Sequence, residues 1–412
     1  MDLLTKVRRF FVPQRLALWT LLASGTYVVL LSPAVFMIYR LSDWVKIIFY
    51  TFPWIMLWPA YSFEVIKDRP HRREIILMGA ILVLGAVNVI FSDAPEDSFK
   101  AMEFFLISGI LPLWTSMFLL ADPQRREVFD WFCCVCLAIF APLAIITYLP
   151  YPQGPSWLRN IFNLHSTPVG TMVILLAAGP IRLLLSESAK QKIIGWLLIS
   201  SALILILLTH KRGTFLAVAA MILVWLTYRL PRLGYLVVAV FLGVLLIFTY
   251  RGLQASRSLA PDHPSRVSKL YRLELYPFAL HVYKKHPLVG IGLRPHTHET
   301  YLLDYQPQHP EVTNFASEVK QLQTFDNLLV TAVVELGSLM TLVYLGLIVF
   351  IVVNYRRQVR PFKESRGRDF VRLLPLVGLA VHSLTYDSLL FPPINWLFHV
   401  QLGILAGFSL SD

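Results

Sequence analysis

Charge is scarce in this sequence, and that scarcity argues against most water-soluble folds. Of its 412 residues, 15% are charged and 56% are hydrophobic, and the mean hydropathy is +0.61. A soluble domain carries about 25% charged residues, so the composition indicates an integral membrane protein. Acidic residues are the scarcer sign, because 37 Lys and Arg stand against 25 Asp and Glu and the formal net charge is +12.

Cysteine is rare, and the common catalytic motifs are missing. Cys133, Cys134 and Cys136 lie within one apolar run, where they form neither a disulfide framework nor a zinc site with the usual ligand spacing. We expect them to be small buried hydrophobic residues. The sequence contains no P-loop, GxSxG, HExxH or dinucleotide-binding motif, so we expect no cofactor.

Long apolar runs fill most of the chain. A transmembrane helix needs about 20 apolar residues, and about twelve segments approach that length. They are residues 16–37, 44–62, 74–91, 102–121, 128–149, 168–186, 193–209, 213–228, 233–250, 325–353, 373–388 and 393–410. The sequence therefore predicts an all-α polytopic membrane protein forming a single integral membrane domain. Helices 1–9 would occupy residues 1–250, a long loop residues 251–324, and helices 10–12 residues 325–412.

Positive residues cluster in alternate connections between these spans. More than half of the Lys and Arg lie in one set of connections. That set comprises the N-terminus and residues 63–73, 121–127, 182–192, 229–232 and 354–372. By the positive-inside rule these connections and both termini are predicted to be cytoplasmic, and the loop 251–324 lies on the outer face. Within that loop, VSKLYRLELYPFALHVYKK predicts one or two short amphipathic helices at the membrane interface.

Three groups of residues on the predicted outer face could bind or transform a substrate. Lys211 and Arg212 are cations on the predicted outer face, where the positive-inside rule expects few of them. Either their side chains reach along the membrane to the interface, or they bind an anion, since the guanidinium group of an arginine matches phosphate oxygens. In the outer loop, Arg272 and Arg294 belong to a cationic group that is either a solvated helix face or a site for a lipid-linked phosphate. Asp326 is either a helix-start residue or a general base.

Further polar residues lie near these groups. Asn327 follows Asp326, and Glu335 would lie about 13 Å further along the helix, inside the bilayer, as a functional carboxylate or with a structural partner. His296 and His298 form an HxH pair that could be a polar loop, a proton-transfer or sugar contact, or part of a metal site. Asp387, at the outer end of its span, is expected to pair with an arginine.

These motifs, taken in order from about residue 160 to the end, resemble those of the O-antigen ligase and polymerase superfamily of integral membrane glycosyltransferases. THKRGTFLA is similar to that family's Ser-Arg-Gly segment, with Arg212 matching its Arg. YRLELYPFALHVYKKHPLVGIG resembles the segment with an Arg and His-Pro-Leu-x-Gly-x-Gly, with Arg272 in place. DNLLVTAVVELG resembles its His-Asn, nine residues, Gly pattern, with Asn327 and Gly337 in place, and HSLTYDSLLFPPINWLF resembles its C-terminal segment with an Asp.

The resemblance implies transfer of a glycan from undecaprenyl pyrophosphate to an acceptor at the outer face of the bacterial inner membrane. Arg212 and Arg272 would hold the pyrophosphate, no metal would be needed, and the anomeric configuration would invert. Expected partners are the lipid-linked donor, a glycan or lipid A core acceptor and membrane lipids, without nucleic acid. Lys211, Asn327, Arg294, His296, His298 and Asp387 are the expected substrate-binding residues.

One departure from the family pattern concerns the reaction itself. Asp326 stands where ligases typically place His, which favours the polymerase branch over a ligase that joins the glycan to lipid A core. His296 or His298 could then serve as the base in place of Asp326. A lipid-glycan flippase or transporter is a further alternative, although its usual long central connection is cytoplasmic. The sequence predicts that Arg212, Arg272 and Asp326 converge in one outward-facing cavity.

Overall fold

A computed structural model describes nine stretches of the chain. They are residues 13–31, 72–148, 166–209, 211–230, 264–293, 298–305, 325–359, 369–387 and 391–408, together with single positions within 231–250 and 388–390. The described residues form helices, turns and short connections, and none of them belongs to a strand.

The first group of helices precedes residue 150. Its elements are α2 (Pro13–Thr26), the π-helix η1 (Tyr27–Leu31), α5 (Arg72–Ile90), α6 (Pro95–Phe105), the π-helix η3 (Leu106–Ile110), α7 (Leu111–Leu119) and α8 (Pro123–Tyr148). Pro95 and Pro123 each begin a helix, where a missing N–H costs nothing. Pro112 cannot donate to the turn before it, and the π-helical turn η3 lies directly before this proline.

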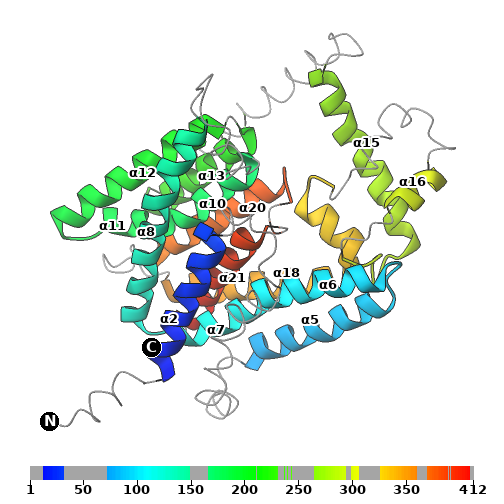
Figure 1. The fold of residues 1–412 in the computed structure, drawn as a ribbon, viewed down its shortest axis with the longest axis horizontal. Coiled ribbons are helices and arrows are strands. Elements are labelled where there is room, and N and C mark those ends of the chain that lie inside the picture. The colour runs from blue at the N-terminus through cyan, green and yellow to red at the C-terminus, as the bar shows by residue number, and fades with distance from the viewer. Residues whose placement is uncertain are drawn as a thin grey trace.

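The remaining helices carry the candidate site. They are α10 (Ser166–Leu176), α11 (Ala178–Leu184), α12 (Ala189–Thr209), α13 (Arg212–Arg229), α15 (Pro264–Lys285), α16 (His298–Tyr305), α18 (Leu328–Val359), the 3-10 turn η6 (Val371–Leu373), α20 (Leu374–Ser383) and α21 (Pro392–Gly407). Figure 1 shows α15 and α16 on one side of the molecule, beyond the ends of α5 and α6.

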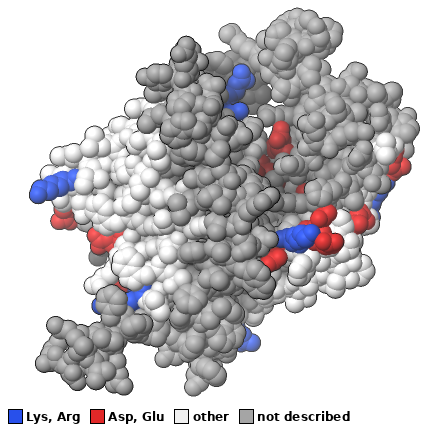
Figure 2. Space-filling model, viewed as in Figure 1, with Lys and Arg blue, Asp and Glu red and all other residues white. Residues whose placement is uncertain are grey.

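Helix α21 lies at the centre of the packing. Fifteen consecutive residues of this helix, 393–407, are buried, including Trp396 at 0% exposure. α21 packs against α7, and Gly403 allows this approach, because a Cβ there would lie 1.9 Å from Ser116 Oγ. By contrast α5 and α12 expose many large apolar side chains. Figure 2 shows a surface in which uncharged side chains predominate among the described residues, with charged ones gathered at a few places.

The helix lengths agree with a membrane protein. Among the described residues, five helices are long and apolar enough to cross a bilayer, and three shorter apolar helices accompany them. Predicted spans 44–62 and nearly all of 233–250 lie outside the described residues, so the predicted total of twelve stays a prediction. The span predicted at 325–353 is not one continuous helix, because α18 is broken at Gly337, with φ 73° and ψ 168°.

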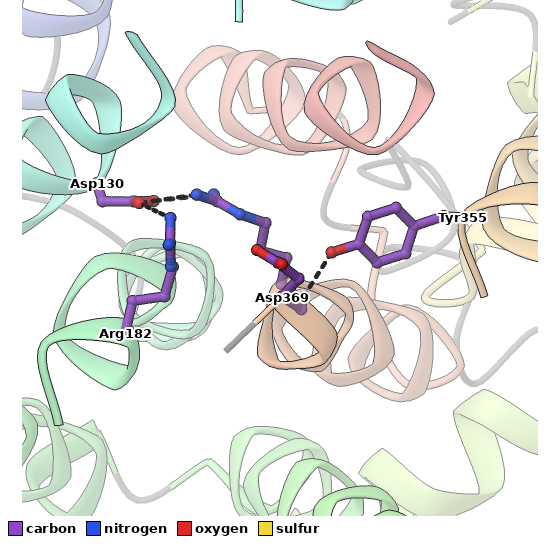
Figure 3. Close-up of polar contacts among 5 residues, drawn as sticks. Asp130, Arg182, Tyr355 and Asp369 are labelled. Atoms are coloured by element: carbon purple, nitrogen blue, oxygen red, sulfur yellow. Dashed lines mark hydrogen bonds and ion pairs between the residues drawn. The ribbon is translucent and has the colours of Figure 1, made fainter. Parts of the chain in front are cut away.

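Two arginines of the connections predicted to be cytoplasmic are removed from water to different extents: Arg372 is buried and Arg182 is half-buried. Arg372 donates from Nη1 and Nη2 to both carboxylate oxygens of Asp130, at 2.9 and 2.8 Å, and Arg182 pairs with the same carboxylate (Figure 3). Beside them, Tyr355 donates to the carbonyl of Asp369 at 2.5 Å. Asp130 and Arg372 are about 95% buried. These cations therefore join α8, α11 and η6, and do not serve only to tether loops to the membrane surface.

Candidate active site

The turn between α20 and α21, residues 384–387, is contacted by the start of α13 and by Asn327 at the start of α18. The first turn of α13 reaches it at Gly213, where an added Cβ would lie 2.4 Å from Thr385 Oγ1 and 3.5 Å from His382 Cδ2. Arg212, the first residue of α13, is exposed beside this contact, and Lys211 before it is half-buried. The absence of a side chain at Gly213 therefore allows Thr385 to approach the backbone of α13 closely.

The N-terminus of α18 reaches the same turn through Asn327. Its Oδ1 accepts hydrogen bonds from the backbone N–H groups of Leu329 (3.0 Å) and Val330 (3.2 Å), the pattern of an N-cap. Its Nδ2 donates to the carbonyl of Leu384 at 3.1 Å. Asn327 therefore starts the helix and also holds that start against the turn.

The two acidic candidates lie on either side of this link. Asp326 precedes the cap and has a φ of +52°, an uncommon conformation for a residue other than glycine. Asp387 is 2% exposed. Tyr386, which precedes Asp387, packs its ring near those of His382 and Phe391, with the ring centroids 6.0 Å apart in both cases. The sequence analysis did not single out this tyrosine, although it is adjacent to Asp387.

An apolar cavity of about 470 Å³ opens next to these residues, between α6, α18, α20 and α21. Ser383, Leu384 and Asp387 line it where α20 ends, and Leu328 lines it where α18 begins. Most of its other lining residues are aliphatic or aromatic, down to the middle of α18. The cavity therefore offers polar groups near the predicted site and an apolar surface beyond them.

Glu335 also lines this cavity. Its side chain is 1% exposed and lies at the end of the first segment of α18, just before the break at Gly337. The sequence analysis expected Glu335 to lie inside the bilayer, and the burial of this residue within the protein agrees with a position away from water. The backbone carbonyl of Glu335 accepts a hydrogen bond from Asn88 Nδ2 at 2.8 Å. A single asparagine in the apolar run 74–91 is the sequence signal that could have identified Asn88.

Helix α15 approaches the site through its second half. Phe278 and Val282 belong to a small core with Phe325 and Val334, and the rings of Phe278 and Phe325 are 6.2 Å apart. Phe325 immediately precedes Asp326, so α15 packs directly against the entry to α18. Arg272 lies on α15, six residues before Phe278.

Several predicted residues cannot be placed at this site. The side chains of Arg272 and His298 belong to helical residues that are described only by their backbone, and Arg294 and His296 lie outside the described residues. The convergence of Arg272 with Arg212 and Asp326 stays a prediction. In the described part of the chain, no group of three or more His, Cys, Asp or Glu is arranged to hold a metal ion.

Part of the chain matches a protein-family model. Residues 196–345 match the family model described as O-Antigen ligase. The matched range includes Arg212, Arg272, Asp326 and Asn327, and it ends before the turn that carries Asp387. A comparison with curated proteins finds no match.

Proposed function

We propose that this chain, whose residues 196–345 place it in the O-antigen ligase and polymerase superfamily, is a glycosyltransferase. In this proposal it transfers a glycan from undecaprenyl pyrophosphate to an acceptor. The family supports a role in O-antigen or surface polysaccharide assembly and a membrane setting for lipid-linked substrates. The donor, the periplasmic location of the site and its mechanism are our proposals.

One observation carries this proposal. The first turn of α13, with Arg212, and the first turn of α18, with Asp326 and Asn327, both lie against the turn 384–387. The apolar cavity beside that turn is suited to hydrocarbon, and the exposed Arg212 is suited to phosphate. A lipid-linked phosphate needs both surfaces at one place.

The proposed reaction breaks the bond between the anomeric carbon and the pyrophosphate oxygen. Asp326 accepts the proton of the acceptor hydroxyl, and the oxygen attacks the anomeric carbon with inversion. Undecaprenyl pyrophosphate leaves with the bonding electron pair. Arg212, together with Arg272, stabilises the negative charge that develops on the leaving pyrophosphate, and no metal is required. Asn327 positions the start of α18, and Lys211 and Asp387 contact the substrates.

We favour a polymerase, in which the acceptor is a second lipid-linked glycan, because Asp326 occupies the position where ligases place His. The alternative acceptor is lipid A core. A flippase, the remaining alternative, would move the donor without breaking it. Release of undecaprenyl pyrophosphate is therefore expected of a polymerase or a ligase, but not of a flippase.

The test uses the purified full chain in liposomes with a lipid-linked glycan donor. We expect undecaprenyl pyrophosphate to be released only when an acceptor is added, and expect the second lipid-linked glycan to serve better than lipid A core. Arg212→Ala should reduce this release by at least 100-fold, because a fixed charge at the leaving group is lost; removing one such group costs about 10²- to 10³-fold. Release should persist in EDTA.

The matched control is Arg229→Ala, at the opposite end of the same helix α13. It should keep nearly full activity. Equal losses in the two variants, or wild-type activity in Arg212→Ala, would contradict the role of Arg212. Movement of intact donor without any release would favour the flippase.

A further inference from the structure

The break in α18 is joined to the loop that follows α15. A continuous helix would pair Ser338 N–H with the Val334 carbonyl and Leu339 N–H with the Glu335 carbonyl. At Gly337 the helix turns, and these four groups bond instead to the loop of residues 287–292. The Val334 and Glu335 carbonyls belong to buried residues, where a polar group left without a hydrogen bond is costly.

The replacement bonds are complete. Ser338 N–H donates to the Pro287 carbonyl at 2.9 Å, and Leu339 N–H donates to the Leu288 carbonyl at 3.2 Å. In the other direction, the loop donates to the first segment of α18. These two bonds run from Ile291 N–H to the Val334 carbonyl (3.1 Å) and from Gly292 N–H to the Glu335 carbonyl (3.0 Å).

Glycine is required where the two backbones meet. A Cβ at Gly290 would lie 2.3 Å from the Glu335 carbonyl oxygen, and a Cβ at Gly337 would lie 2.3 Å from the Leu288 carbonyl oxygen. Both residues have positive φ, 80° and 73°. The first glycine of this Gly-x-Gly sequence, Gly290, therefore allows the backbone of the loop to contact the backbone of α18.

Asn88 of α5 closes this junction from a third helix. It is 1% exposed, and its Nδ2 donates to two carbonyls at once, Val289 of the loop at 2.6 Å and Glu335 of α18 at 2.8 Å. One side chain thus holds the loop and the broken helix together. Its Oδ1 has no hydrogen-bond partner among the described residues, so the amide's interactions here are those two donations.

We propose that Asn88 is a positioning residue for the transferase site. The loop leads back to α15, which carries Arg272, and the first segment of α18 begins at Asp326 and Asn327. By holding the loop to the Glu335 carbonyl, Asn88 sets the position of α15 relative to the start of α18. This inference rests on the proposed function for its effect on catalysis, whereas its structural part stands on the hydrogen bonds alone.

The test compares Asn88→Ala, which removes both donated bonds, with Asn88→Ser, whose hydroxyl can donate one. We expect kcat to fall by about 10- to 100-fold in Asn88→Ala, because small misplacements of reacting groups cost about that much. Asn88→Ser should fall between Asn88→Ala and the wild type. The KM for the donor should change much less than kcat, since the groups that bind the lipid remain.

A distance measurement provides a readout that is independent of activity. Spin labels go on cysteines introduced at Leu280 of α15 and Leu329 in the first segment of α18, which are 53% and 46% exposed. Cys133, Cys134 and Cys136 are buried and stay unlabelled. We expect the label-to-label distances to shift or broaden in Asn88→Ala, and to a smaller extent in Asn88→Ser. Gly79→Ala, on the same helix with open space around it, is the matched control and should leave distances and kcat unchanged.

Two results would overturn the inference: unchanged distances in Asn88→Ala, or a loss of kcat in Gly79→Ala equal to that in Asn88→Ala. If the wild-type protein transfers no glycan, the proposed function fails, and the distances alone decide the positioning role.

Discussion

At the scale of single residues, Asn327 shows how one side chain links local and tertiary structure. Its oxygen accepts from the first turn of α18, and its nitrogen donates to the Leu384 carbonyl on the turn that carries Asp387. The family resemblance assigns Asn327 to the substrate. The hydrogen bonds show that it first has a structural task, and they allow the two functions to be separated.

We predict that Asn327→Asp and Asn327→Ala differ in stability and agree in activity. The carboxylate of Asn327→Asp can still cap the helix but cannot donate to Leu384, whereas Asn327→Ala loses both interactions. Loss of an N-cap costs about 1 kcal/mol, so thermal unfolding in detergent should show a lower midpoint for Asn327→Ala than for Asn327→Asp. Both variants should lose glycan transfer. Full activity in Asn327→Asp would mean that the bond to Leu384 is unimportant for the site.

At the scale of elements, the break in α18 decides where the site lies. The first segment, residues 328–336, ends at a glycine whose ψ of 168° with positive φ is a conformation essentially confined to glycine. Because of this break, the first segment runs in a different direction from the long second segment. Its N-terminus contacts the turn 384–387 through Asn327. A helix N-terminus carries partial positive charge, which suits a site for phosphate.

We predict that Gly337→Ala strongly destabilises the protein. The backbone strain alone is about 1–3 kcal/mol, and the new Cβ would meet the Leu288 carbonyl oxygen at 2.3 Å. Gly346→Ala, further along the same helix with nothing within 4 Å of its Cβ, should instead raise stability by about 0.5–1 kcal/mol. Thermal unfolding of the two variants measures this contrast. Similar midpoints would show that the break is not needed for folding.

At the scale of the whole molecule, two groups of polar contacts bear on the candidate site. One is the region of the site and the junction at Gly337. The other is the group of Asp130, Arg182 and Arg372, beside which Arg126 lies over the Phe408 ring at 4.3 Å. Arg372 lies in the turn η6, which directly precedes α20, and α20 ends just before the turn 384–387. The buried ion pairs therefore anchor the end of α20 that lies away from the site.

We predict that Asp130→Asn destabilises the protein, because it leaves the buried guanidinium group of Arg372 and the half-buried one of Arg182 without their carboxylate. Breaking a buried pair by removing one partner costs about 3–5 kcal/mol. The exposed pair of Glu96 and Lys100 provides the control: Glu96→Gln should leave the thermal midpoint nearly unchanged, since exposed pairs add little. Equal midpoints for the two variants would contradict the anchoring role.

Much of the fold was predictable, because apolar length and glycine or proline punctuation are local properties. The described helices α5, α8, α12 and α21 lie where apolar runs predict them. The break at Gly337 was not predicted, because the apolar run continues across it and only the loop at 287–292 makes it stable. The convergence of Arg212, Arg272 and Asp326 was expected from the sequence and stays a prediction, because the side chain of Arg272 lies outside the described residues. Tyr386 and Asn88 were not singled out from the sequence, and their contacts in the structure drew attention to them.

The sequence by itself determined that this is an apolar, helical membrane protein with an excess of cations, and its short motifs pointed to a superfamily. Hydrophobic length and composition act within each segment and need no partner. Tertiary structure alone decided which cations pair with Asp130 and which remain in contact with solvent. It also decided at which glycines two backbone segments come into contact. Those outcomes depend on hydrogen bonds and ion pairs between residues up to about 250 positions apart, and the order of residues along the chain does not specify such pairings.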